Sequence, residues 1–526
     1  MQCVSSWRAN SYLMAVLMAF GKGIPYFYLQ TSLNTLQPFL EDFIRRKINA
    51  DPPAMVWIWP LALTLPSLAS LVTSTAFSSR LSDTLGRKAA FLLSGPALLL
   101  LTMALFASAQ LLDSLTLLGL AILAMYVEYG IAEPINFTYL SEISCPELQG
   151  SANALCVALW QLGDIVCSIA AHKSFLGRPD SWWRVYAFAT CPTALTLVLC
   201  SLWLPESPKW LHLIKGDAPR ARRALRTLGV PEDEVDRALE RISEEAMSES
   251  LSRPSRLTMQ HLLLDAKHAR LVVVVTLVSI TGAVNLGSSL NYYSTGRAVA
   301  SVVGSAASVI AVRWVNRRPH LIWTQIGTSV ALLLSALFAY AGSVGINVEF
   351  SLHLCAASLL AGSCFVAAGA KTLCQFLPAE MTVTRYRAAA TALGTVAREV
   401  VMFPYLLLFL PSVEAWGGPG LLPFILCNLL VAAALHFLQP ESRGRTPAQV
   451  FAQLLPSFEA AAGRDETRPL LTTPACSSNC SHRSSSPAFP CLWHFLRHLR
   501  RVCCYCSDDG GDPTPPNPAV QVKTLT

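Results

Sequence analysis

Several ionisable residues stand inside long apolar stretches of this chain, where their chemistry would be to bind or move a charged group. The clearest cases are Glu128, Asp164, Lys371 and Arg398. A charged side chain in a bilayer interior is energetically unfavourable, so such residues face a cavity or a partner. We expect these four to line a central cavity and bind a polar solute. The alternative is that they pair between helices or snorkel to the membrane surface.

Other residues in the same stretches are weaker candidates for this cavity. Glu133 is expected near the end of its helix, and Glu399 is expected to point away from the face that Arg398 uses. Gln161 and Tyr292 are expected solute contacts. For both residues, core packing or the aromatic belt at the membrane surface is the alternative.

The composition indicates which elements must position these side chains. Of the 526 residues, 53% are hydrophobic and only 14% are charged, whereas soluble proteins carry roughly 25% charged residues. Most of the surface therefore does not face water. The net charge is +7, but Lys and Arg gather in short segments between apolar stretches. No soluble basic domain is present, so we expect no nucleic acid among the partners.

A helix needs roughly 20 mostly apolar residues to cross a bilayer. The chain is therefore predicted to be an all-α polytopic membrane protein with twelve transmembrane helices in two six-helix bundles. The eighth helix has little room, which predicts that it is shortened or tilted. The predicted spans are 11–30, 56–78, 89–110, 114–135, 151–172, 184–204, 271–292, 297–313, 320–342, 350–374, 388–410 and 419–437.

Charge and cysteine placement predict how the chain sits in the membrane. Basic residues follow the second, eighth and tenth spans and fill the central polar segment, so the positive-inside rule places both termini in the cytoplasm. The apolar stretch at 12–28 is expected to be the first span and not a cleavable signal. Most of the 16 cysteines lie in apolar stretches or in the tail. We therefore expect no structural disulfide.

The chain divides into four predicted regions. Residues 1–208 form an N-terminal six-helix bundle, 209–270 a polar and mostly helical cytoplasmic segment, and 271–447 a C-terminal six-helix bundle. Residues 448–526 form a disordered cytoplasmic tail rich in Ser, Pro and Thr.

The loop after the second span, RLSDTLGRKAA, resembles the D-x-x-G-R-[RK] signature of the major facilitator superfamily. The matching residues are Asp83, Gly86, Arg87 and Lys88. Glycine allows a tight turn, and the charged residues can form an ion-paired latch at the cytoplasmic face. The alternative is an ordinary basic loop. The equivalent loop of the second half, RWVNRRPH, carries Arg313 where the acid is expected.

Four more segments are similar to sugar porters and organic ion transporters of that superfamily. They are YLSEISCPELQG, LPESPKWL, EMTVTRYR and PESRGR, at the ends of the fourth, sixth, tenth and twelfth spans. The resemblance implies that they complete the gate. The predicted gating residues are Asp83, Gly86, Arg87, Lys88, Glu142, Glu206, Glu380 and Arg387.

The segment GTVAREVVMFP resembles the eleventh helix of organic cation and anion transporters, with Arg398 at the charged position. Cation carriers of that family tend to have Asp there and anion carriers Arg, so the resemblance favours an anionic or zwitterionic solute. It implies an atypical solute carrier that moves a small organic solute by alternating access, facilitatively or with a coupling ion. No P-loop or catalytic constellation is present, so we expect no enzyme activity, metal or cofactor.

The alternative function is a non-transporting receptor or scaffold built on a transporter fold. It is favoured by the departures from the family pattern at Arg313, at Gln149 in place of Arg, and at Val383 in place of Pro. A shared fold does not by itself establish function.

The tail carries a candidate sorting signal. ETRPLL fits the acidic dileucine pattern through Glu466, Leu470 and Leu471. Such motifs dock in clathrin adaptors, so the adaptor is an expected partner beside the lipid bilayer and the solute. This multi-pass protein is accordingly expected in the plasma membrane or in an endosomal or lysosomal membrane.

Overall fold

The computed structural model describes residues 5–49, 51–250, 262–263, 268–283, 294–445 and 447–454. Two sets of predictions lie outside these residues: the solute contact at Tyr292, and the sorting residues Glu466, Leu470 and Leu471.

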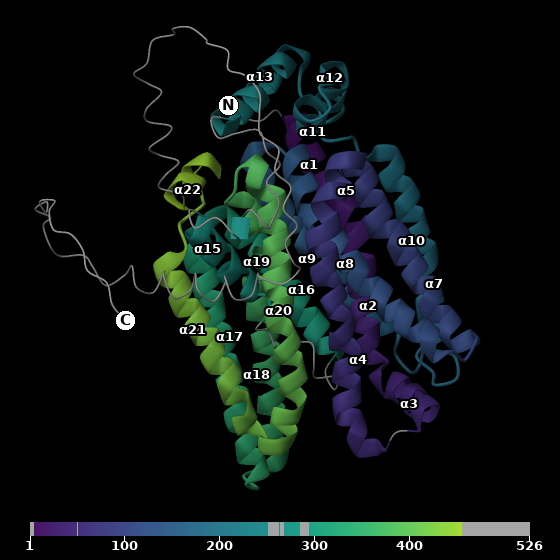
Figure 1. Ribbon diagram of the computed structural model, residues 1–526. Helices are drawn as coiled ribbons and strands as arrows, with labels where there is room; N and C mark the ends of the chain where they lie inside the picture. Colours follow the sequence, from purple (N-terminus) through teal and green to yellow (C-terminus); the bar gives the residue numbers. More distant parts are fainter. Residues whose placement is uncertain are drawn as a thin grey trace, which may run out of the picture.

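All regular structure in the described residues is helical. Eleven of the described helices are long and apolar enough to cross a membrane, and the shorter apolar helix α15 (Ala269–Ile280) occupies the place of the predicted seventh span. The helices form two bundles that stand side by side (Figure 1). The predicted fold class is confirmed.

The first bundle begins with a helix that runs from Ser5 to Thr35 and contains a π-helical turn at Ala19–Gly23. Similar π turns interrupt the second and third spans at Ser74–Ser78 and Leu93–Ala97. Such π-helical turns within α-helices are frequently found at functional sites. The helices of this bundle are α1 (Ser5–Met18), α2 (Ile24–Thr35), α3 (Gln37–Ile48), α4 (Pro52–Thr73), α5 (Ser79–Leu85), α6 (Arg87–Leu92), α7 (Leu98–Leu111), α8 (Leu115–Ile143), α9 (Gln149–Ala170) and α10 (Trp183–Trp203).

The second bundle contains a helix break and a long helix. Its tenth span is broken at Gly369, between α18 and α19, where an added Cβ would lie 1.7 Å from Thr324 Oγ1. Its eleventh span, α20, is 33 residues long. The helices are α15, α16 (Ser294–Trp314), α17 (Arg317–Ser343), α18 (Val348–Ala368), α19 (Ala370–Glu380), α20 (Thr384–Trp416), α21 (Leu422–Leu438) and α22 (Pro447–Leu454).

The prediction of a shortened eighth span is wrong. Helix α16 has 21 residues because it begins at Ser294, inside the segment that was expected to be a turn. It packs along α9 of the other bundle.

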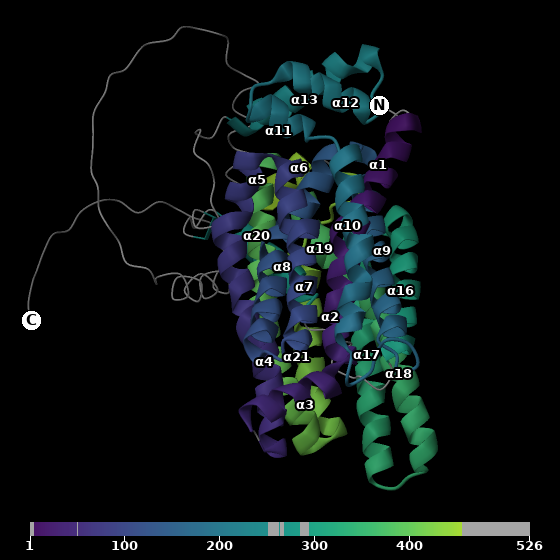
Figure 2. The ribbon, with the colours of Figure 1, turned by 90° about the vertical axis from the view of Figure 1, so that its right-hand side faces the viewer.

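The central polar segment forms three helices, α11 (Pro208–Leu213), α12 (Ala218–Thr227) and α13 (Glu232–Ser250). They lie together at one end of the molecule, beside the start of α1, and α3 lies at the opposite end (Figure 2). These are named here the α13 end and the α3 end. Trp210, Leu225 and Leu239 are buried within this helical group, so its amphipathic helices bury their apolar faces against one another.

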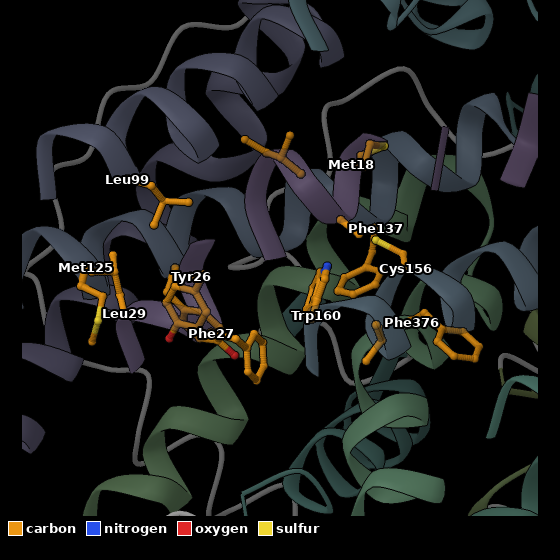
Figure 3. Close-up of a cluster of buried hydrophobic side chains, with 14 of the residues drawn as sticks. Met18, Tyr26, Phe27, Leu29, Leu99, Met125, Phe137, Cys156, Trp160 and Phe376 are labelled. Carbon is orange, nitrogen blue, oxygen red and sulfur yellow. The ribbon is translucent and has the colours of Figure 1, made fainter. Parts of the chain in front are cut away.

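The outer surface of the bundles is apolar, as a lipid-facing surface must be. Large hydrophobic side chains are exposed along the outer helices, among them Trp323 (69%), Leu202 (70%) and Phe437 (79%). Between the helices, aromatic side chains pack against one another around Trp160 (Figure 3). Its ring centroid lies 5.3 Å from that of Phe137 and 5.7 Å from that of Phe27.

The expectation of no structural disulfide is wrong at Cys145, which is disulfide-bonded. The other cysteines in the described part of the chain are free. Apolar surroundings predict a free thiol correctly within the spans, but Cys145 lies in the turn between α8 and α9.

Candidate solute-binding site

A cavity of about 230 Å³ lies between the two bundles. It is lined by α2, α4, α8 and α9 from the first bundle and by α16, α18, α19 and α20 from the second. Five charged residues from the described part of the chain reach its wall: Asp164, Arg297, Lys371, Arg398 and Glu399. A mostly apolar cavity with a few convergent polar groups is typical of a small-molecule site.

On one side of the cavity, Lys371 of α19 joins the two bundles. Its Nζ donates to Gln161 Oε1 at 2.7 Å and lies 3.6 Å from Asp164 Oδ2, both on α9. It also lies 4.4 Å from the centre of the Phe27 ring. Thr31 donates a hydrogen bond to the other oxygen of Asp164. The structure therefore brings three of the predicted solute-binding residues into one contact group.

On another side, Arg398 of α20 makes a second link between the bundles. Its Nη1 donates to Gln375 Oε1 at 2.6 Å, and its Nη2 lies 3.8 Å from Glu133 Oε1 on α8. Its guanidinium also lies 5.0 Å from the centre of the Tyr129 ring. The Nε atom is 4.0 Å from Glu399. The expectation that Glu399 points away from the face used by Arg398 is wrong. The two residues are neighbours on α20, and the Arg398 side chain is long enough to reach the Glu399 carboxylate.

Behind the cavity wall lies Lys22, an ion-pair partner that the sequence analysis missed. It is fully buried, its ammonium donates to Glu133, and it lies 4.6 to 5.3 Å from the centres of three aromatic rings. The signal was present, because Lys22 interrupts the apolar stretch at 12–28. The expectation that Glu133 lies near a helix end is also wrong, because α8 continues to Ile143.

Glu128 does not reach the cavity wall. It is fully buried, and neither carboxylate oxygen has a hydrogen-bond partner in the described part of the chain. Its role as a direct solute contact thus has no support from its position.

At the α13 end, the predicted latch residues of the first bundle meet. Arg87 lies 2.6 Å from Asp83 Oδ1 and 3.2 Å from Glu142 Oε2. Glu206 accepts hydrogen bonds from the backbone N–H groups of Arg87 (2.8 Å) and Lys88 (3.1 Å). Burial raises the pKa of Glu206, and these backbone donors oppose the rise.

Gly86 makes this contact possible. Its φ of +96° lies in the region that favours glycine, and an added Cβ would lie 2.5 Å from a Glu206 oxygen. The signature glycine therefore serves both the turn and the approach of Glu206.

The second bundle repeats the arrangement. Glu441 accepts from the backbone N–H groups of Arg317 (2.8 Å) and Arg318 (3.1 Å), and Arg317 lies 3.4 Å from Glu380. Glu441 lies in the PESRGR segment but was not among the predicted gating residues.

Arg387 differs from the other predicted gating residues. It is buried and donates to the backbone carbonyls of Ala379 and Thr382 at 3.1 and 3.4 Å. These bonds close the turn between α19 and α20.

Contacts also join the two bundles at the α13 end. Arg313 Nη2 lies 2.8 Å from Tyr12 Oη, which in turn lies 3.1 Å from Ser151 Oγ. Gly150 lies so close to Arg317 that an added Cβ would be 2.6 Å from Nη2. The bundles are therefore in contact at this end.

Two helical membrane bundles with a polar cavity between them and clusters of ion pairs at one end define a transporter of the major facilitator type. A family model described as "Sugar (and other) transporter" matches residues 14–451, and the chain belongs to this family. It is a multi-pass membrane transporter and not an enzyme.

Similar proteins include facilitated sugar carriers. The chain is 22% identical over 457 residues to "Solute carrier family 2, facilitated glucose transporter member 5" of Mus musculus, covering 82% of this chain and 90% of that one. It is 23% identical over 466 residues to member 7 of the same family from Homo sapiens, covering 83% and 89%.

Solved structures agree on the fold. The proton:xylose symporter XylE bound to 6-bromo-6-deoxy-D-glucose superposes with a TM-score of 0.70 at 16% identity, covering 87% of this chain and 99% of that one. The inward-open form of XylE from E. coli gives 0.64, also at 16% identity, covering 85% and 100%. The expected resemblance to sugar porters is confirmed, and the resemblance to organic ion carriers stays a prediction.

Proposed function

We propose that this transporter carries a small organic anion or zwitterion by alternating access. The supporting observation is the charge at the cavity wall, where three cations, Arg297, Lys371 and Arg398, face two carboxylates, Asp164 and Glu399. A single negative charge on the solute would balance this excess. In a site with little water, such a pairing is strong because screening is weak.

The same ion pairs offer a way to couple binding to movement. Lys371 contacts α9 and Arg398 contacts α8, so each of these two cations of the second bundle holds a residue of the first. A solute carboxylate that competes with Asp164 for Lys371 would replace a contact between the bundles by a contact to the solute. The bundles would then rock about the central site while the latches at the α13 end open.

A neutral sugar is the second candidate, because the relatives are named for glucose and xylose. Amide side chains in the cavity wall, at Gln30, Asn34 and Gln375, could hydrogen-bond hydroxyl groups. Charge separates the two candidates: an anion would pair with the Arg398 guanidinium, whereas a neutral sugar has no charge to pair with it.

Arg398→Ala is expected to reduce saturable uptake of the anionic substrate. Loss of one charge-assisted hydrogen bond is worth about 1.5–3 kcal/mol, which corresponds to a roughly 10- to 100-fold loss in kcat/KM. The measurement is uptake of labelled organic anions, cations and sugars into proteoliposomes, with and without pH and sodium gradients. Asp83→Asn tests the latch in the same assay.

The matched control is Arg46→Ala, because Arg46 is 68% exposed on α3 and pairs with Asp42 away from the cavity wall. Uptake of a sugar that is equal in wild type and Arg398→Ala would support the neutral substrate instead. No uptake of any compound by folded protein would support the receptor or scaffold.

A further inference from the structure

A second cavity, of about 590 Å³, lies at the α13 end between the two bundles. It is named here the basic vestibule. Among the described residues, its wall shares none with the wall of the solute cavity. The described charged residues of its lining are Arg8, Glu147, Arg313, Arg317, Glu380, Arg443 and Arg445.

The vestibule carries an excess of positive charge. Its two carboxylates are already engaged, Glu147 by Arg8 at 2.8 Å and Glu380 by Arg317 at 3.4 Å. The remaining three arginines make no ion pair with a carboxylate in the described ranges of the chain: they are Arg313, Arg443 and Arg445.

Neutral partners hold these three arginines in place. Arg443 donates to the carbonyls of Trp314 (2.5 Å) and Arg313 (2.8 Å), at the end of α16. Arg445 donates to Gln453 Oε1 at 3.0 Å. Arg313 donates to Tyr12 Oη and lies 5.7 Å from the centre of that ring. These contacts restrict the side chains without neutralising them, so their charge is available to a ligand.

Comparison of the two bundles shows that the charge at one position is reversed. In the first bundle, Asp83 pairs with Arg87. In the second, Arg317 repeats the contacts of Arg87, but Arg313 stands four residues before it. In the first bundle this position forms an ion pair within the latch. In the second bundle it holds a cation, Arg313, which lines the space between the bundles. A basic loop alone does not require this reversal.

We propose that the basic vestibule binds a small soluble ligand with clustered phosphate groups and that the bound ligand holds the two bundles together at the α13 end. Guanidinium groups pair with phosphate through two parallel hydrogen bonds. Three excess cations suit a ligand with several negative charges, and the volume suits a small molecule. In the predicted orientation this end faces the cytoplasm, where soluble phosphate compounds are abundant.

The test uses full-length protein in detergent and inorganic tripolyphosphate as the probe. Binding is followed by calorimetry, and the thermal unfolding midpoint is measured in parallel. The midpoint is expected to rise with tripolyphosphate concentration, because a ligand that binds only the folded state stabilises it. Sulfate at matched ionic strength is expected to give no comparable rise.

Arg313→Gln and Arg445→Gln are each expected to weaken tripolyphosphate binding about tenfold. Both side chains are exposed, so the midpoint without ligand should change only slightly. Arg222→Gln is the matched control, since that exposed arginine lies on α12 and outside the vestibule wall. Equal affinity in the wild type and in the Arg313→Gln/Arg445→Gln variant would overturn the proposal.

A lipid headgroup could supply the same chemistry. Protein in nanodiscs with and without a phosphoinositide separates the two sources. Binding of phosphoinositide nanodiscs without any binding of tripolyphosphate would overturn the soluble ligand. Tripolyphosphate binding that is equal in both kinds of nanodisc would support it. None of these readouts depends on which solute is transported.

Discussion

Gly163→Ala is expected to reduce the stability of the folded protein severely. A Cβ at this position of α9 would lie 2.3 Å from the carbonyl oxygen of Ile24 and 2.9 Å from the backbone nitrogen of Tyr28. Both atoms belong to the backbone of α2, which cannot move aside as a flexible side chain can. Overpacking usually costs about 1–3 kcal/mol, and this backbone clash is expected to exceed that range.

Gly119→Ala is the matched control. Gly119 lies on α8, and nothing lies within 4 Å of its added Cβ. Alanine favours a helix over glycine by about 1 kcal/mol, so this variant is expected to unfold at the wild-type temperature or slightly above it. The measurement is the thermal unfolding midpoint in detergent, determined from the fraction of protein that remains monodisperse after heating. Equal midpoints for the two variants would contradict the close approach of α2 and α9.

The consequence of Gly163→Ala extends to the solute cavity. Gly163 is adjacent to Asp164 and close in sequence to Gln161, which bind Lys371. Separation of α9 from α2 would also break the hydrogen bond from Thr31 to Asp164. Variant protein that is rescued by low temperature is therefore expected to show reduced uptake as well.

Glu133→Leu is the second change with a large expected effect. It leaves the fully buried Lys22 without the carboxylate that accepts its hydrogen bond. Removal of one partner from a buried ion pair costs about 3–5 kcal/mol. The rings of Tyr26, Tyr129 and Trp160 still attract the ammonium, which places the expected loss near about 3 kcal/mol, the lower end of that range.

The double variant Lys22→Met/Glu133→Leu is expected to recover most of this stability. It removes both charges, and apolar side chains of similar size commonly replace a buried pair without loss. Asp236→Leu is the control, because its pair with Arg222 is exposed on both sides; the expected loss there is below about 1 kcal/mol. If the double variant is no more stable than Glu133→Leu, then the unpaired charge of Lys22 is not the cause of the lost stability in Glu133→Leu.

Much of the ion-paired cluster at the α13 end was predictable from the sequence because its residues occupy the ends of spans. Asp83, Arg87, Glu142 and Glu206 follow or terminate even-numbered spans, which brings them to the same membrane surface. Residues at the same membrane surface lie close enough to one another to form these ion pairs and backbone hydrogen bonds. The contacts of Glu441 with the second bundle follow the same rule.

The interior of the site was less predictable. Hydropathy predicted that the fourth span ends near residue 135, but α8 continues to Ile143. The length of an apolar stretch indicates how much of a helix crosses the lipid, and the helix itself can extend beyond it. Glu133 therefore seemed to be a terminal residue when it is an interior one. Glu399 was misjudged because the reach of a long neighbouring side chain is not visible in helical periodicity.

Span length, composition and loop motifs were enough to predict a polytopic helical membrane transporter. A bilayer requires apolar helices of a minimum length whose backbone groups hydrogen-bond within the helix. The amino-acid composition of each segment shows whether it meets this requirement. Tertiary packing pairs Lys22 with Glu133 and lets Lys371 and Arg398 link the two bundles. It also brings into one vestibule three arginines that have no carboxylate partner in the described part of the chain. Such pairings depend on which helix faces meet, and helix packing between distant segments determines that.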